Sequence, residues 1–234
     1  MCSVSYLPNP EGGFILTSNR DESIHRQSLS PQKYLYKETE MIFPKDSQVF
    51  GSWIACSAHS AVCLLNGARE AHHHQPPYKM SRGVVLLDLL SEKDIHSFRE
   101  KYYLVDIEPF TVIYVDMLNI KLYELVWDGK YADLSELDPT QAYFWSSSTL
   151  YNHEWRIRRK KWFMDFIQDQ PILKPQDAFN FHSHADHGND EYDLVMSRKG
   201  GELRTISITQ IIHPKICTML YRDLLSQKET VISF

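Results

Sequence analysis

Short segments of alternating or β-branched apolar residues recur along most of the chain, and turn signals separate many of them. The expected strands cover residues 3–7, 14–18, 53–57, 61–65, 110–116, 120–126, 143–145, 192–196 and 203–208. Helical patterns cover residues 84–90, with a continuation toward residue 103, and residues 154–168 and 218–225. Antiparallel hairpins with helices inserted between them predict an α+β fold rather than a doubly wound parallel sheet.

The composition is that of a globular protein with a sizeable core. With 234 residues, 43% of them hydrophobic, and no repeat or low-complexity linker, the chain is expected to form one domain over residues 1–234. The net charge is −5 and acidic and basic residues are interspersed, which argues against a nucleic-acid-binding protein. No apolar run is long enough to span a bilayer, and no basic segment followed by an apolar one opens the chain. These observations predict a cytoplasmic protein and leave its oligomeric state open.

The cysteines differ in their surroundings. They form no CxxC pair, which fits neither a zinc site nor a disulfide-rich secreted scaffold. Cys56 and Cys63 flank an expected hairpin and are interpreted as small buried hydrophobic residues. Cys2 stands apart, because it follows Met1 directly and precedes the first expected strand.

The first two expected strands are close enough in sequence to form a hairpin. If residues 11–12 are a two-residue loop, the numbers of opposed residues sum to 23, and Cys2 lies opposite Asp21. A register shifted by one residue brings Arg20 or Glu22 opposite instead. In each register, charged groups surround the start of the chain.

Removal of Met1 would give Cys2 both a thiol and a free α-amine. An α-amine has a reference pKa of about 7.7–8.0 and a thiol one of about 8.5, so proton transfer between them near neutral pH is nearly balanced. Asp21 could then stabilise the ammonium form, and Arg20 could favour the thiolate or bind an anionic substrate group. The alternative is that Cys2 is a frayed terminal residue and that the charged run forms surface ion pairs.

Several longer motifs accompany the N-terminal cysteine. They are, in order, MCSVSYLP, SNRDES, GSWIA, CLLNGAR and SRGVVLLDLL, followed more loosely by FWSSSTLYN and GELRTISIT. This set resembles the NRDE family, also called the transport and Golgi organisation protein 2 family. That family in turn resembles choloylglycine hydrolases and penicillin V acylases, which are N-terminal-nucleophile (Ntn) hydrolases. The resemblance implies a four-layer αββα sandwich of antiparallel sheets.

The resemblance also assigns roles to individual residues. Cys2 corresponds to the nucleophile of the acylases and Asp21 to their aspartate. Asn66 lies near their first oxyanion-hole asparagine, whose amide would stabilise charge on the attacked carbonyl. Asn19 and Arg20, within the NRDE segment itself, are expected to bind substrate or support the site.

Three other positions depart from the acylase pattern. Ser18 stands where the acylases have an arginine, three residues before the aspartate. The second oxyanion-hole asparagine is sought at residues 146–148, where only serines occur, and Ser147 is the expected supporting residue. A late arginine of the acylases corresponds to either Arg198 or Arg204.

Two functions are compatible with this resemblance. The first is hydrolysis of a non-peptide amide (C–N) bond of a small molecule through Cys2, without a metal or other cofactor. The second is a non-enzymatic carrier or chaperone that holds a small hydrophobic ligand, such as a lipid, acyl-CoA or haem, in the same cleft.

Three polar clusters suggest other chemistry. Residues 182–187 spell the HxHxDH string of the metallo-β-lactamase fold, but His213 is the only later histidine, which favours a polar loop. Residues 72–74 are consecutive histidines followed by prolines, which predicts a loop that could border the site near Asn66. Residues 155–162 predict a basic helix, either a surface for an acidic partner or a solvated face.

Overall fold

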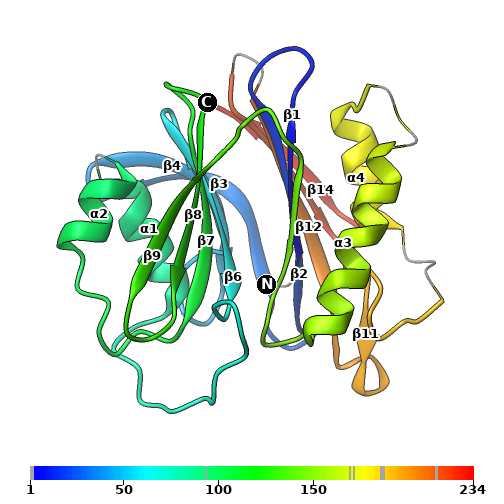
Figure 1. Ribbon diagram of the computed structural model, residues 1–234, viewed down its shortest axis with the longest axis horizontal. Helices are drawn as coiled ribbons and strands as arrows, with labels where there is room; N and C mark the ends of the chain where they lie inside the picture. Colours follow the sequence, from blue (N-terminus) through cyan, green and yellow to red (C-terminus); the bar gives the residue numbers. More distant parts are fainter. Residues whose placement is uncertain (1–2, 93, 169, 171, 185–187, 214–215) are drawn as a thin grey trace.

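The computed structural model describes residues 3–92, 94–168, 170, 172–184, 188–213 and 216–234. Two antiparallel sheets of seven strands face each other, and two helices cover the outer face of each sheet (Figure 1). This is the four-layer αββα sandwich that the family resemblance implies, and the α+β fold class is confirmed. Within the described residues, no helix is both long and apolar enough to cross a membrane.

The first sheet has the strand order β10-β1-β2-β12-β13-β14, and β11 pairs with β12. Its strands are β1 (Ser3–Pro8), β2 (Phe14–Ser23), β10 (Tyr143–Ser146), β11 (Ser197–Arg198), β12 (Leu203–His213), β13 (Thr218–Asp223) and β14 (Glu229–Ser233). Helices α3 (His153–Gln168) and α4 (Pro175–Ser183) cover its outer face (Figure 1). Strand β1 lies inside this sheet, because it pairs with β10 on one side and β2 on the other.

The second sheet follows chain order from β3 to β9. Its strands are β3 (Ser28–Tyr36), β4 (Thr39–Asp46), β5 (Ile54–Ser57), β6 (Ser60–Asn66), β7 (Phe110–Asp116), β8 (Lys121–Trp127) and β9 (Ala132–Leu137). Helices α1 (Arg82–Ser91) and α2 (Ile95–Lys101) come between β6 and β7 in the chain and cover the outer face. A short 3-10 helix, η1 (Lys199–Gly201), precedes β12.

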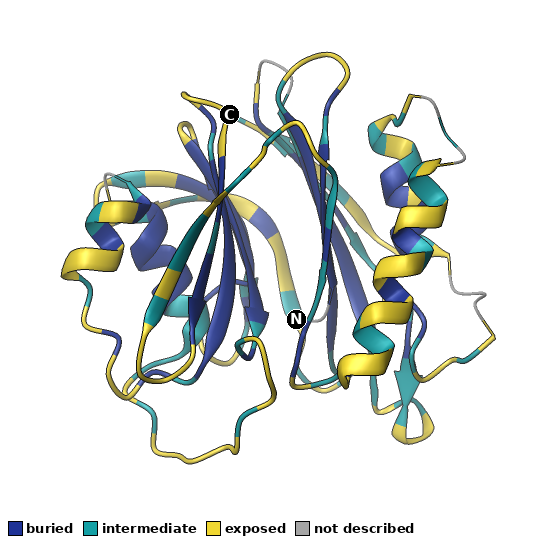
Figure 2. Ribbon diagram, viewed as in Figure 1, coloured by how far each residue is buried: buried dark blue, intermediate teal, exposed yellow. Residues whose placement is uncertain are grey.

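Side-chain alternation along the strands divides the hydrophobic residues among three cores, one between each pair of adjacent layers. In β2, Phe14 and Leu16 belong to the core between the sheets, whereas Ile15 packs in the core beneath α3 and α4. A third core lies between the second sheet and α1 and α2. The inner strands are accordingly buried over most of their length, whereas the edge strands β3, β9 and β14 are more exposed, and the helices expose their outer sides (Figure 2).

Side-chain caps define the beginnings of α1 and α2. The Ser81 side chain accepts a hydrogen bond from the Gly83 N–H, and the Asp94 side chain accepts one from the Ser97 N–H. Serine and aspartate suit these positions because their oxygens satisfy N–H groups that lack a partner inside the helix.

Several expected elements differ from the structure. The helix expected at residues 218–225 is wrong, because β13 occupies Thr218–Asp223 between β12 and β14. Its buried residues, Met219 and Tyr221, alternate with more exposed ones, which is the period of a strand. Residues 192–196 do not form the expected strand, and β11 follows them instead. Strands β3, β4, β9 and β14 and helix α4 were not expected.

The register of the first hairpin differs by one residue from the expected one. Ser3 pairs with Asn19 and Pro8 with Phe14, so opposed numbers sum to 22 rather than 23. The loop is longer than two residues, since the Asn9 N–H donates to the Gly13 carbonyl and the Asn9 side chain accepts from Glu11 N–H. The expected pairing of Cys2 with Asp21 lies outside the described residues.

Candidate active site

The expected site lies at the end of the first sheet where β1 begins. Met1 and Cys2 lie outside the described residues, so Ser3 is the described residue next to the expected nucleophile. Ser3 is fully buried and pairs with Ser146 on one side and Asn19 on the other. The start of β1 is therefore held within the sheet.

Asp21 is buried on β2 and accepts two hydrogen bonds from distant parts of the chain. The Tyr151 hydroxyl donates to Oδ2 at 2.9 Å, and the Thr205 hydroxyl donates to Oδ1 at 2.6 Å. Thr205 is also the residue of β12 that lies opposite Asp21 in the sheet. Both carboxylate oxygens are thus oriented by hydroxyl donors, which suits a group that must hold a fixed direction.

Arg159 of α3 is fully buried, and it connects Ser3 with the residues around Asp21. Its Nη2 donates to the Ser3 hydroxyl, and its Nε donates to the Ser146 hydroxyl at 3.2 Å. The guanidinium also lies over the Tyr151 ring, at 4.0 Å from the ring centre. Its Nη1 donates to the carbonyl oxygens of residues 192 and 193 at 2.5 and 2.6 Å. The interpretation of residues 155–162 as a solvated face is therefore wrong at Arg159.

Asn19 and His182 form a second buried polar group on the same face of the first sheet. Asn19 Nδ2 donates to the carbonyl oxygens of His182 and Leu194, so its Oδ1 is the atom that accepts from His182 Nδ1, at 2.5 Å. His182 Nε2 then accepts from the Ser5 hydroxyl at 2.8 Å. Burial, with Arg159 nearby, lowers the pKa of His182 to about 3, so the ring is neutral.

These contacts bear on the HxHxDH string. His182 is a residue of α4 whose two ring nitrogens bond to Asn19 and Ser5, and His184 Nδ1 lies 2.6 Å from the Asn180 carbonyl. Residues 185–187 lie outside the described residues. In the described part of the chain, no three His, Cys, Asp or Glu side chains are grouped so that they could hold a metal ion.

Arg20 lies on the opposite face of β2 from Asn19, between the two sheets. Its guanidinium donates to Asp46 Oδ2 at 2.5 Å and to the Ser28 hydroxyl at 2.6 Å, and it lies over the Trp53 ring at 4.4 Å. Burial lowers the pKa of Arg20, although Asp46 favours its charged form. The contacts observed for Arg20 therefore join the first sheet to the second.

Asn66 and Ser147 meet at the end of the space between the sheets. Asn66 ends β6, and its carbonyl oxygen accepts from the Ser147 hydroxyl at 2.7 Å. The next residue, Gly67, has a φ of +85°, and a Cβ there would lie 2.3 Å from Ser148 Oγ. Only glycine permits this backbone conformation together with so close an approach. The structure thus brings together two of the residues expected for an oxyanion site.

Two cavities border the Asn66–Gly67 segment. Asn66 lines a small one of about 80 Å³ together with Arg20 and Trp53. Gly67 lines a larger one of about 310 Å³, which we call the cleft. The residues that line the cleft include Trp145 and Ser146 from the first sheet, residues 147–148 after it, Leu65, Glu124 and Val126 from the second sheet, and Arg69 and Arg156. A further cavity of about 400 Å³ shares residues 68–70 with the cleft and includes His72.

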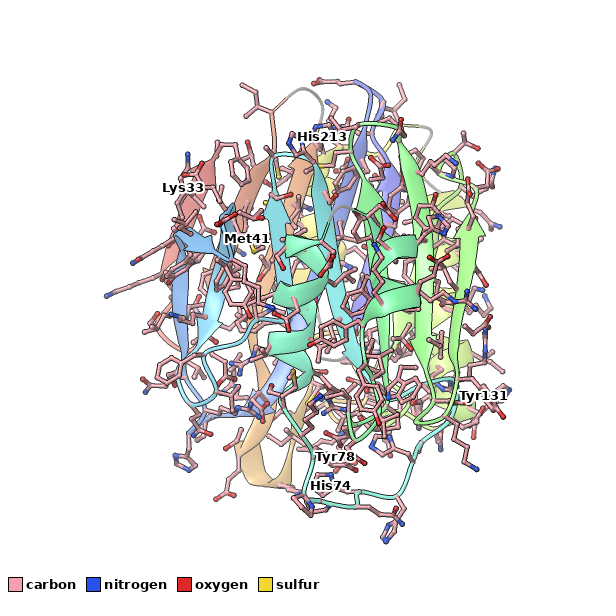
Figure 3. All side chains as sticks on the ribbon, turned by 90° about the vertical axis from the view of Figure 1, so that its left-hand side faces the viewer. Lys33, Met41, His74, Tyr78, Tyr131 and His213 are labelled. Carbon is pink, nitrogen blue, oxygen red and sulfur yellow. The ribbon has the colours of Figure 1, made fainter. Side chains whose placement is uncertain are left out.

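The histidine loop at residues 72–74 is attached to Glu108. His72 Nε2 and His74 Nδ1 each lie 3.1 Å from Glu108 Oε1, and Arg82 Nη2 lies 2.9 Å from Oε2. Burial alone would raise the pKa of Glu108, but Arg82 and the two histidines together bring it below its usual value. His74 and Tyr78 lie side by side on this loop, beyond the ends of the strands (Figure 3).

The sequence did not identify Tyr151 and Thr205, which donate to Asp21, or Arg159, which lies over the Tyr151 ring. Tyr151 and Thr205 do occur in the motifs FWSSSTLYN and GELRTISIT, so the signal was present without an assigned role. Arg159 gave no such signal, because it stands among other basic residues of a polar helix. Of the two possible late arginines, Arg198 contacts Tyr151, with its guanidinium 5.1 Å from the ring centre.

Comparisons with known proteins establish the family of the chain and show a similar fold. The fold is similar to that of the Caenorhabditis elegans N-acylethanolamine-hydrolyzing acid amidase (NAAA) ortholog, with a TM-score of 0.61 and 11% sequence identity. The similarity covers 91% of this chain and 93% of the amidase chain. No curated protein matched the sequence. A family model described as Transport and Golgi organisation 2 matches residues 1–210, and the chain therefore belongs to that family.

Proposed function

We propose that this protein hydrolyses an amide bond of a small molecule, with Cys2 as an N-terminal nucleophile. One observation carries the proposal: β1 begins inside the sheet, with Ser3 held by Arg159 and by both neighbouring strands. An edge strand with a loose start could not orient a catalytic residue in this way. The fold shared with an amide-hydrolysing enzyme supports the same reaction class.

The reaction follows from the chemistry of an N-terminal cysteine. After removal of Met1, the Cys2 amine takes the thiol proton, and the thiolate attacks the amide carbonyl. The Asn66 side-chain amide and a backbone N–H would stabilise the oxyanion. Collapse of this intermediate transfers the proton to the leaving amine and leaves a thioester on Cys2. Water then attacks the thioester with the amine as base, which releases the acid and restores the thiol.

In this proposal, the buried residues position the groups that react. Asp21, oriented by Tyr151 and Thr205, would hold the ammonium form of the Cys2 amine. Arg159 would fix the start of β1 through Ser3. Arg20 acts by holding the sheets together through Asp46, so its effect on substrate is indirect.

The experiment combines N-terminal sequencing of the native protein with intact mass measurement during turnover of p-nitroanilide substrates. We expect Met1 to be absent, p-nitroaniline to be released, and a transient acyl adduct to map to Cys2. The variant Cys2→Ala should abolish both adduct and release, whereas the matched control Cys217→Ala should retain them.

The other cysteines do not compete in this experiment. Cys56, Cys63 and Cys217 are buried, as expected for Cys56 and Cys63. Burial raises the pKa of Cys63 to about 12, and burial beside Cys217 also raises that of Cys56. An unreactive Cys2 in protein that retains a co-purified hydrophobic ligand would instead support the carrier function.

A further inference from the structure

The cleft contains a carboxylate whose two oxygens have different surroundings. Glu124 of β8 faces the space between the sheets, as Leu122 does two residues earlier. Its Oε1 accepts a hydrogen bond from the Trp145 indole N–H at 2.8 Å. Its Oε2 lies 3.9 Å from Arg69 Nη1 and accepts no hydrogen bond from any residue that the structure describes. Glu124 is thus fixed by one oxygen, and the other can bind a donor.

Glu124 lies close to the start of β1. Its partner Trp145 pairs with Val4 across the sheet, and the next residue, Ser146, pairs with Ser3. Neighbouring positions along a strand are about 3.3 Å apart. A molecule whose carbonyl lies at the start of β1 therefore needs only a short arm to reach Glu124.

The two cations that line the cleft are each paired with a carboxylate other than Glu124. Arg156 pairs with Glu70, and Arg69 pairs with Asp133, which lines the neighbouring cavity. Arg69 is mostly exposed and lies closer to Asp133, at 2.5 Å, than to Glu124. Exposed pairs of this kind hold their side chains weakly, so Arg69 can move away when a ligand cation approaches Glu124.

We propose that Glu124 binds an ammonium group of the substrate. This inference rests on the proposed function and names its substrate class: a small amide that carries an amino group a few bonds from the scissile carbonyl. An ammonium donating to a half-buried carboxylate forms a charge-assisted hydrogen bond, which is stronger than one between neutral groups. A long apolar acyl chain would instead remove Glu124 Oε2 from water without supplying a hydrogen-bond donor to it.

Binding can be tested without turnover. The probes are n-butylammonium, n-butanol and butyrate, which have the same chain length and differ in charge. The readout is the NMR signal of the Trp145 indole N–H, assigned with Trp145→Phe. Butylammonium should shift this signal at lower concentration than the other two probes. A stronger response to butyrate, or equal responses to all three, would overturn the inference.

Two variants should change this binding in opposite directions. Glu124→Gln should weaken butylammonium binding roughly tenfold or more, because a hydrogen bond to a charged group is lost. Arg69→Ala should strengthen it, because a competing cation is removed. Glu136→Gln is the matched control, since Glu136 lies on the neighbouring strand β9, pairs with Lys121 and does not line the cleft. An unchanged affinity in Glu124→Gln would contradict the proposal.

A turnover measurement separates this inference from the proposed function. The substrates are the p-nitroanilides of β-alanine, propionic acid and succinic acid, which present an ammonium, no charge and a carboxylate. We expect kcat/KM to be highest for the β-alanine compound, and Glu124→Gln to remove that preference. Ammonium-selective binding without hydrolysis of any anilide would overturn the hydrolase function and leave the cation site. Hydrolysis with no preference for the ammonium substrate would support the hydrolase function and overturn the proposal for Glu124.

Discussion

The two sides of the candidate site are built differently. Beneath α3 and α4, the contacts of Arg159, Asn19 and His182 are buried hydrogen bonds between residues far apart in the sequence. At the rim of the cleft, Arg69 pairs with Asp133 and Arg156 pairs with Glu70, and both pairs are in contact with water. A buried polar group without a partner costs much more than a solvated one. The buried side should therefore fix the geometry of the site, whereas the rim can vary in charge at little cost in stability.

Replacement of Arg159 should give the largest effect. Arg159→Met removes donors to the hydroxyls of Ser3 and Ser146 and to two carbonyls, and leaves these acceptors buried. We expect a loss of about 3 kcal/mol in the free energy of unfolding, measured by urea denaturation. The control is Arg158→Met, since Arg158 is exposed and pairs with Glu154. Equal losses in the two variants would contradict the contrast between buried and exposed groups.

The neutral His182 should make the fold sensitive to acid. Its pKa is about 3 in the folded protein, against 6.5 without burial, so the unfolded chain binds more protons between these pH values. Stability should therefore fall as the pH drops through this range, by about 2 kcal/mol from pH 7 to pH 5. His182→Gln should reduce this dependence in urea denaturation at the two pH values. A similar reduction in His184→Gln, which changes an exposed histidine, would argue against the assignment.

Loss of the Tyr151 hydroxyl should have a smaller effect on stability and a clear one on reactivity. Tyr151→Phe keeps the ring beneath Arg159 and removes one donor to Asp21, which should cost about 1 kcal/mol. Under the proposed mechanism, the pH profile for alkylation of Cys2 should also shift, because Asp21 is less well oriented. Tyr192→Phe is the control, since this ring stacks on Trp155 and its hydroxyl makes no hydrogen bond to another described residue. Identical pH profiles in wild type and Tyr151→Phe would contradict the proposed effect of Asp21 on the reactivity of Cys2.

The smallest effect is expected at the rim. Asp133→Asn breaks the pair with Arg69, in which both side chains are more than half exposed. The change in the free energy of unfolding should stay within about 0.5 kcal/mol and should shrink further in high salt. A loss comparable to that of Arg159→Met would show that the rim, too, is structural.

The sequence predicted those features that depend on residues close together in the chain. Strand β7 has the bounds expected from its apolar run, because a period of two is set by the backbone itself. The prediction of a helix at residues 218–225 was wrong because a short apolar segment fits the period of a helix and that of a strand. Pairing with β12 and β14 stabilises the strand. The predicted register of the first hairpin was wrong by one residue, because the loop contains an additional turn at Asn9.

In the candidate site, too, residue types could be read from the sequence, whereas their contacts could not. Family motifs predicted roles for Asp21, Asn66 and Cys2 from the sequence alone, and these roles stay predictions, with Cys2 outside the described residues. Alternation along β2 places Asn19 and Arg20 on opposite faces of the sheet, but no local pattern indicated their partners, Leu194 and Asp46.

By itself, the sequence determined the strand-rich α+β class, the order of the motifs and the types of residue available for chemistry, because each depends on short-range pattern or residue identity. Only the tertiary structure decided which partners these residues have. Thr205 lies 184 positions from Asp21 and reaches it because β12 pairs with β2. Such contacts depend on strand register and on the helix packed above, and neither is set by residues close together in the chain.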